Sequence, residues 1–119
     1  MPSTEVHLRQ ARHNEAFFAA IKPDLYSDWA VTVLFYSALQ YVDAYLAKLG
    51  YLDPGPHEVR DGFVRQYQPT REVSREYFRL KNYSVNARYY AARFSPGDVR
   101  GLHLGDFETI KARMMAELP

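Results

Sequence analysis

The longest apolar pattern in the chain covers residues 27–49. Apolar and aromatic side chains recur there on nearly every side of a helix, and the strong polar interruptions are few: Thr32, Gln40, Asp43 and Lys48. A helix that is apolar on most sides is buried on most sides. The pattern therefore predicts the central helix of an all-α domain, with Trp29 and Leu39 inside. Ser27 suits its N-cap and Gly50 its C-terminal end.

Four more segments show helical periodicity, over residues 4–22, 56–67, 71–94 and 106–117. Proline-containing breaks separate the first four helices, and Ser95-Pro96-Gly97-Asp98 is expected to end the fourth. Consecutive helices joined by short connections pack antiparallel. We therefore expect one domain over residues 1–119, built as an up-and-down bundle of four to five helices.

Two of these helices carry distinctive faces. Helix 56–67 has an apolar ridge of Val59, Phe63 and Tyr67. Helix 71–94 has an apolar seam at 3-4-3-4 spacing whose second half is small, formed by Val73, Tyr77, Leu80, Ser84, Ala87, Ala91 and Phe94. Small residues let another helix approach closely. Together with the aromatic excess of helix 27–49, this seam predicts a homodimer.

Composition narrows the class of protein. The chain has no cysteine, which excludes a disulfide framework and a thiol nucleophile. Its first residues are charged and lack the apolar core of a signal peptide. Helix 27–49 has the length of a membrane span, but Gln40, Asp43 and Lys48 argue against one. We expect a cytoplasmic protein that does not enter a membrane.

The formal net charge of +1 hides an asymmetry along the chain. Residues 23–58 hold five acids and one base, whereas residues 59–93 hold eight bases and three acids. The two halves can pair with each other inside the bundle, or the second can present a basic face to a polyanion.

The basic half contains one candidate ligand site. Arg71, Arg75 and Arg79 lie at i, i+4 and i+8 on helix 71–94, and Glu72 and Glu76, three positions before Arg75 and Arg79, can offset their repulsion. The cluster that follows, Arg79, Asn82, Tyr83 and Arg88, combines donors with an aromatic ring, which suits phosphate binding and base stacking. The alternative is a solvated, self-compensated face.

The sequence lacks the motifs of zinc sites, di-iron sites and glycine-rich phosphate loops. His57-Glu58-x-x-Asp61 resembles half of a zinc motif but has no second histidine. No glutamate is followed by histidine at the Glu-x-x-His spacing of di-iron bundles, and no glycine-rich phosphate loop occurs. We expect no metal and no cofactor.

A family resemblance follows from the run Phe35-Tyr36-Ser37-Ala38-Leu39 with Ala44 and Gly50, then a proline-bounded loop, His57 and Phe63, then Leu80 and the segment around Arg88-Tyr89-Tyr90. Over about residues 27–93 the chain resembles the HEPN superfamily (higher eukaryotes and prokaryotes nucleotide-binding). The resemblance implies a helical bundle of four or five helices, usually dimeric. Members are RNA-cleaving toxins or defence nucleases, or helical partners of small nucleotidyltransferases.

The chain departs from the ribonuclease members, in which histidine follows an arginine after four to six residues. Ser84, Val85 and Asn86 occupy those places after Arg79. Without that imidazole a ribose hydroxyl has no evident proton acceptor. The hypothesis is a non-catalytic HEPN-like module that binds a nucleotide, RNA or a partner protein around Arg79. The alternatives are a metal-independent endoribonuclease that uses Arg79 and His57, and a purely protein-binding bundle.

Overall fold

The computed structural model describes residues 3–51 and 56–118, and helices account for its regular structure. The helices are α1 (Thr4–Ala20), α2 (Ser27–Lys48), α3 (His57–Gln66), α4 (Gln68–Glu72), α5 (Ser74–Tyr89), α6 (Pro96–Gly101), the π-helical segment η1 (Leu102–Phe107) and α7 (Glu108–Glu117). No strand occurs in these two ranges, and the prediction of an all-α bundle is confirmed.

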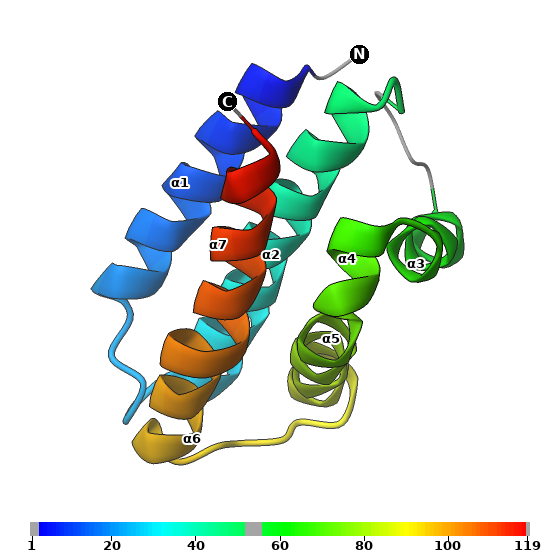
Figure 1. Ribbon diagram of the computed structural model, residues 1–119. Coiled ribbons are helices and arrows are strands. Elements are labelled where there is room, and N and C mark those ends of the chain that lie inside the picture. Colours follow the sequence, from blue (N-terminus) through cyan, green and yellow to red (C-terminus); the bar gives the residue numbers. More distant parts are fainter. Residues whose placement is uncertain (1–2, 52–55, 119) are drawn as a thin grey trace.

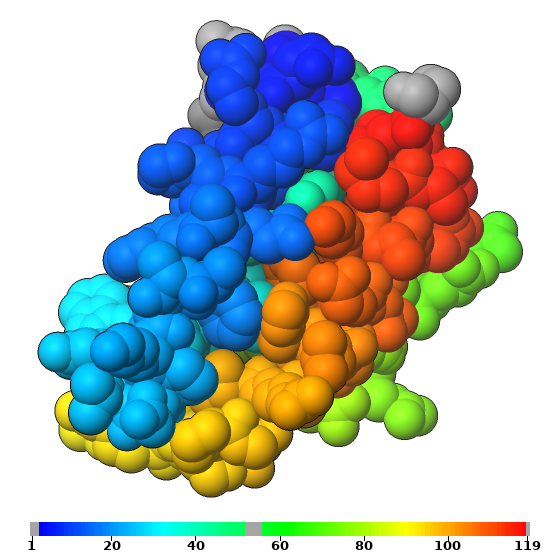
Figure 2. Space-filling view, turned by 90° about the vertical axis from the view of Figure 1, so that its left-hand side faces the viewer, coloured from blue at the N-terminus to red at the C-terminus, as the bar shows by residue number. Residues whose placement is uncertain are grey.

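The long helices lie side by side in three rods (Figure 1). α1 and α2 form an antiparallel pair, and the rod made by α6, η1 and α7 runs next to them in the direction of α2. α5 crosses this group steeply and is seen almost end-on. Viewed from the side, α1 and α7 cover α2 so that little of it shows between them (Figure 2).

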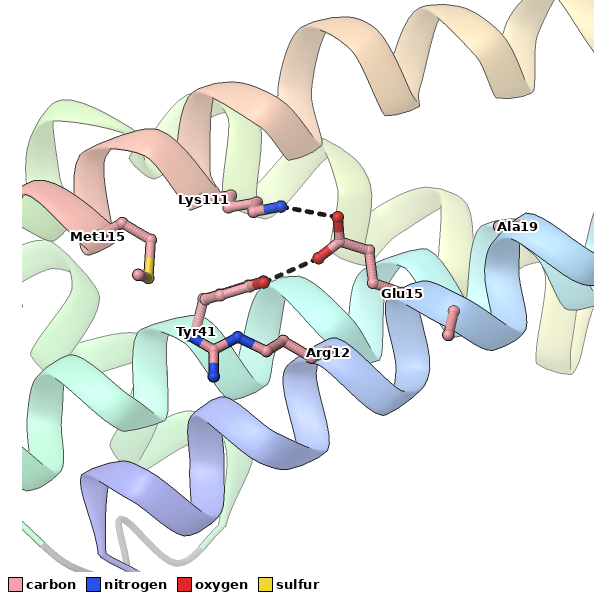
Figure 3. Close-up of a pocket in the computed structure, with 7 residues that line it drawn as sticks. Arg12, Glu15, Ala19, Tyr41, Lys111 and Met115 are labelled. Atoms are coloured by element: carbon pink, nitrogen blue, oxygen red, sulfur yellow. Dashed lines mark hydrogen bonds and ion pairs between the residues drawn. The ribbon is translucent and has the colours of Figure 1, made fainter.

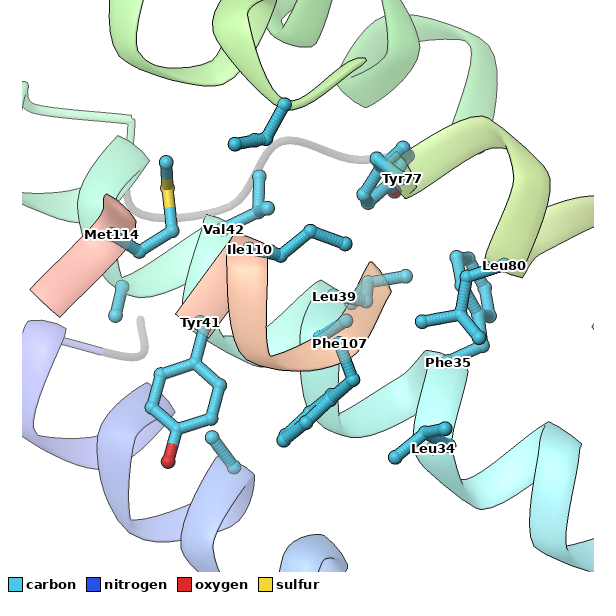
Figure 4. Packing of buried hydrophobic residues seen from close by; sticks show 14 of the residues in the cluster. Leu34, Phe35, Leu39, Tyr41, Val42, Tyr77, Leu80, Phe107, Ile110 and Met114 are labelled. Carbon is cyan, nitrogen blue, oxygen red and sulfur yellow. The ribbon is translucent and has the colours of Figure 1, made fainter. Parts of the chain in front are cut away.

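α2 is the centre of the core, as its pattern predicts. It packs on α1, α5 and α7, and its buried side chains point in every direction around its axis. Phe35 and Leu39 face α5, where Tyr77 and Leu80 meet them, while Tyr41 and Phe107 pack edge to face (Figure 4). Burying so many large apolar side chains, at roughly 1.5–3 kcal/mol each, supplies most of the drive for folding.

Trp29 is a correction to the expected core. Leu39 is buried, but the side chain of Trp29 at the start of α2 is 59% exposed. The first turn of α2 is packed on one side, where Ser27 and Ala30 are buried, and Trp29 lies on its uncovered side, near the corner where α1 ends at Ala20 instead of residue 22. The periodicity of an apolar helix indicates which side chains share a face, but not which faces its neighbours cover.

The predicted helix 71–94 is wrong in extent. It divides at Val73 into α4 and α5, and α5 ends at Tyr89. Ala91 then takes a left-handed conformation with φ of 53°. The following residues fold back, and the amide of Phe94 donates to Ser27 Oγ at 2.9 Å. Tertiary contacts therefore end the helix about one turn before the predicted residue 94. The sequence has no glycine at this point that would have indicated the end.

The predicted break at residues 95–98 is the start of the last helical rod. Ser95 Oγ accepts from the amide of Asp98 at 3.0 Å, and the Asp98 carboxylate accepts from the amide of Ser95, which forms a capping box. The rod continues through η1 to Glu117, so the predicted helix 106–117 begins ten residues earlier, at Pro96.

The apolar ridge predicted for residues 56–67 is not the buried face of α3. Val59 is 44% exposed, and Phe63 and Tyr67 are half-buried. The residues of α3 that are buried are Arg60, Asp61 and Val64. This short helix packs with its charged side inward because Arg60 pairs with Asp43 of α2 and Asp61 pairs with Lys81 of α5.

One helix, α2, is long and apolar enough to cross a membrane by length and composition, with a mean hydropathy of 1.2. However, 83% of that window is buried inside the bundle. This burial is typical of a core helix, and it agrees with the sequence-based argument against a membrane span. Cytoplasmic location stays a prediction.

Candidate functional site

The four predicted ligand residues do not form one cluster. Arg79 and Arg88 are nine positions apart on α5, and at roughly 100° per residue this places them on opposite sides of the helix. Tyr83 shares the side of Arg79, and both line one hollow with Asp106. Asn82 is exposed. The structure thus offers two separate arginine sites on α5.

The Arg79 site is already neutralised. The Arg79 guanidinium donates to both oxygens of Asp106 on η1, from Nε at 2.8 Å and from Nη2 at 2.9 Å. These hydrogen bonds raise the pKa of Arg79. The adjoining hollow of about 310 Å³ also contains Asp98. Two carboxylates around one guanidinium disfavour a bound anion, although the Arg79 side chain is 52% exposed.

The Arg88 site is different because neutral groups hold the guanidinium. Arg88 Nε donates to Ser84 Oγ at 3.1 Å, and Nη1 donates to the hydroxyl of Tyr36 on α2 at 2.9 Å. The guanidinium lies over the rings of Tyr36 and Tyr89. Among the described residues, no carboxylate lies within ion-pair distance of it. Most of its five N–H groups are therefore available, in a fixed orientation.

Arg88 lines a cleft of about 190 Å³ between α2 and α5, together with Ala87, Asp28, Trp29 and Thr32. Asp28 is the only acid among these five residues, and its carboxylate is 3.5 Å from Arg93 Nη1, so that a second arginine offsets its charge. The Thr32 hydroxyl is already used, since it donates to the carbonyl of Asp28 at 2.8 Å. The cleft thus combines an oriented guanidinium with an exposed indole.

His57 lies away from Arg79. His57 Nδ1 lies 3.4 Å from Arg60 Nη1, within its own helix α3. α3 packs on the side of α5 that carries Lys81, which pairs with Asp61, and Lys81 is about half a turn of helix from Arg79. Burial lowers the pKa of His57, and the charges of Arg60 and Lys81 lower it further. The structure therefore does not assemble the Arg79–His57 pair of the nuclease hypothesis.

A buried polar cluster, which the sequence analysis missed, fixes α3. Arg60 donates to both carboxylate oxygens of Asp43 on α2, from Nε at 2.7 Å and from Nη2 at 3.0 Å. Asp61 pairs with Lys81 of α5 at 2.5 Å. Burial raises the pKa of Asp43 and Arg60 opposes this, while the pKa of Arg60 is itself raised by Asp43 against the effect of burial. Each member of the pair favours the charged form of the other, and burial opposes both charges.

Tyr77 of α5 reaches the edge of this cluster without joining it. Its side chain is fully buried, and its hydroxyl has no hydrogen-bond partner among the described residues. Burial raises the pKa of this hydroxyl, so Tyr77 stays neutral. A buried polar group without a partner costs roughly 1–3 kcal/mol.

We therefore expect Tyr77→Phe to raise the free energy of unfolding by about 1 kcal/mol, measured by urea denaturation. Tyr41→Phe is the matched control, since the buried Tyr41 hydroxyl donates to Glu15 Oε1 at 2.8 Å. The control should lower the same quantity by about 1–2 kcal/mol. Equal losses in the two variants would show that the Tyr77 hydroxyl has a partner.

A hollow of about 560 Å³ lies between α1 and α7 with Tyr41 of α2 on its floor (Figure 3). Glu15 occupies two of the donors that line it, because it accepts from the Tyr41 hydroxyl and from Lys111 Nζ, each at 2.8 Å. Arg12 lines the same hollow. The Glu15 carboxylate ties α1 to α2 and α7 and so holds the three rods together.

Within residues 3–51 and 56–118, no group of three or more acidic or histidine side chains is placed to hold a metal ion. Comparison with known protein families, with curated proteins and with solved structures finds no match to this chain. The geometry of the cleft and the resemblance seen in the sequence therefore remain as the guides to function.

Proposed function

We propose that this chain is a non-catalytic HEPN-like helical module that binds a nucleotide or RNA in the cleft around Arg88. One observation carries the proposal: the Arg88 guanidinium is oriented by Ser84 and Tyr36, has no carboxylate partner among the described residues, and shares a cleft with Trp29. The proposal keeps the ligand class expected from the sequence and moves its main contact from Arg79 to Arg88.

The chemistry of the cleft supports an anionic, planar ligand. An arginine fork binds a phosphate through two parallel N–H donors, and its affinity is greatest where no carboxylate competes. The exposed face of Trp29 offers a surface on which a base can stack. The cleft, at about 190 Å³, is smaller than the roughly 300–1,000 Å³ of pockets that enclose a whole small molecule. It suits one phosphate and one base of a larger ligand.

Intrinsic fluorescence tests this proposal, because Trp29 is the one tryptophan of the chain. We expect single-stranded hexauridylate to quench it, with an affinity that falls as salt rises. Arg88→Ala should weaken binding by about 10- to 100-fold, the effect of losing a charge-assisted hydrogen bond of roughly 1.5–3 kcal/mol.

Two arginines of α5 provide matched controls. Arg75→Ala removes an exposed arginine that does not line the cleft, and it should change affinity by less than about threefold. Arg79→Ala should behave in the same way. A loss confined to Arg79→Ala would place the ligand at the site first expected from the sequence. No quenching by hexauridylate or by ATP would contradict the proposal.

Dimerisation and a nucleotidyltransferase partner remain predictions from the sequence. The surfaces that suggested a dimer are used inside the chain, since Ser84 and Ala87 are buried on α5 and most aromatic residues of α2 lie in the core. A second copy or a small nucleotidyltransferase would therefore bind elsewhere on the molecule.

A further inference from the structure

We infer that the ligand is a single-stranded nucleic acid with at least two successive unpaired nucleotides, and that Trp29 separates two neighbouring base sites. This inference rests on the proposed function and specifies its substrate class. The first base site is the Arg88 cleft. The second is a larger apolar hollow that Trp29 also lines.

The second hollow lies at the corner between the end of α1 and the start of α2. Its volume is about 460 Å³, and Trp29 lines both this hollow and the Arg88 cleft. The corner, light blue at the lower left of Figure 2, is at one end of the molecule. Its exposed side chains include Phe17 at 54%, Leu25 at 62% and Tyr26 at 54%.

These exposed apolar side chains are contiguous, unlike the single apolar residues that are common on protein surfaces. Phe17, Leu25, Tyr26 and Trp29 line one hollow, and such contiguous exposed apolar surface on a monomer commonly marks a binding site. Their rings and alkyl groups offer flat contact without a hydrogen-bond pattern that would select one base. Stacking on such a surface tolerates any base, because each base has a π-face.

The charges around Trp29 favour a polyanion over an apolar protein segment. Lys22 lines the hollow and Arg88 lines the cleft, so that each of the two spaces lined by Trp29 has a cation. Arg93 offsets Asp28, the acid of the cleft. A strand whose bases enter the two spaces would carry its linking phosphate past the indole, near these cations. A duplex cannot bind in this way because its bases are already paired and stacked.

A chain-length series tests the inference. We would titrate the full chain with uridine monophosphate, the dinucleotide UpU, the trinucleotide and hexauridylate, and follow Trp29 fluorescence. The dinucleotide should bind about 5- to 100-fold more tightly than the mononucleotide, as expected for one additional stacked base. Thymidine oligonucleotides of equal length show whether the site also accepts single-stranded DNA.

Leu25→Ala isolates the second site, and its exposure makes it safe for folding. It should reduce the preference for the dinucleotide at least threefold and leave mononucleotide affinity unchanged, whereas Arg88→Ala should weaken both ligands. Val59→Ala, at another exposed apolar position, on α3 and far from the hollow in the chain, should change neither.

Several outcomes would overturn the inference, and they differ from failure of the proposed function. Equal affinities for mononucleotide and dinucleotide, both weakened by Arg88→Ala, would keep the proposed function and remove the second site. If Leu25→Ala changes the mass seen by light scattering but not dinucleotide affinity, the hollow is an interface between two copies. Absence of binding by every oligonucleotide would overturn the proposed function and this inference together.

Discussion

Asp43→Ala is expected to lower the free energy of unfolding by about 3–5 kcal/mol, the typical cost of removing one partner from a buried ion pair. The side chains of Asp43 and Arg60 are only 3% and 10% exposed. Without Asp43, the Arg60 guanidinium keeps its charge but loses both hydrogen bonds in a place that water hardly reaches. Most of the loss therefore comes from an uncompensated charge. Urea denaturation followed by circular dichroism would measure it.

Two further variants separate this effect from a general sensitivity to mutation. Asp24→Ala, at an exposed position before α2, should change stability by less than about 0.5 kcal/mol. The double variant Asp43→Leu with Arg60→Met should regain most of the loss, because an apolar pair of similar volume removes both charges. A single variant as stable as Asp24→Ala would mean that the pair is open to solvent.

Phe107→Ala is expected to cost about 3–5 kcal/mol of unfolding free energy, in the range of large core truncations. Phe107 is fully buried within η1, where its ring packs against those of Tyr41 and His103. The truncation would leave a cavity beneath α2 that the surrounding rods can fill only in part. Thermal denaturation followed by circular dichroism should show a correspondingly lower midpoint.

Leu104→Ala is the matched control for this prediction, since Leu104 belongs to the same π-helical segment but is 57% exposed. It should change stability by no more than about 0.5 kcal/mol. Phe107→Leu, which keeps most of the volume, should cost less than about 1.5 kcal/mol. Similar losses for Phe107→Ala and Leu104→Ala would mean that the helical register of this segment differs from the one described.

The core could be predicted from the sequence because one strong pattern determines it. Residues 27–49 are apolar around the helix, and α2 is the helix on which the others pack. The seam of α5 was likewise right for Tyr77, Leu80, Ser84 and Ala87, all buried. Helical periodicity reports such faces well because burial repeats with the same period.

The ends of α5 could not be predicted, because contacts distant in the sequence determine them. Nothing at Ala91 signals a left-handed residue, which is usually glycine. The end of α5 at Tyr89 is explained by the contacts of Phe94, whose ring packs on Tyr83 and whose amide donates to Ser27 Oγ. The start of the last rod was missed for a related reason: Ser95-Pro96-Gly97-Asp98 suits a helix N-terminus as well as a turn.

The candidate site was predicted only in its residue types. Arg88 was among the residues proposed from the sequence, but its partner Tyr36 and its neighbour Trp29 belong to a helix expected to be buried on most sides. The sequence also left open whether the basic half faces inward, and the structure answers this residue by residue. Arg60, Arg79 and Lys81 pair with acids of the same chain, Arg79 at the surface, whereas Arg88 does not.

One signal in the sequence pointed to the buried pair. Asp43 interrupts an otherwise apolar helix, and a carboxylate in such a place requires a cation. The sequence offered eight bases in residues 59–93 and no means to choose among them. Only the position of α3 singles out Arg60.

The π-helical turn of the last rod determines how that rod responds to a change in the number of its residues. Such a turn holds one residue more than an α-helical turn. Deleting one residue of this segment, such as Gly105, would return it to an α-helical turn and leave α7 near its present rotation about the rod axis. Ile110 and Met114 would then keep their places in the interior. A residue deleted from α7 ahead of them would instead rotate the rest of that helix by roughly 100°. The wide turn is therefore the part of the last rod best able to accept the loss of one residue during evolution.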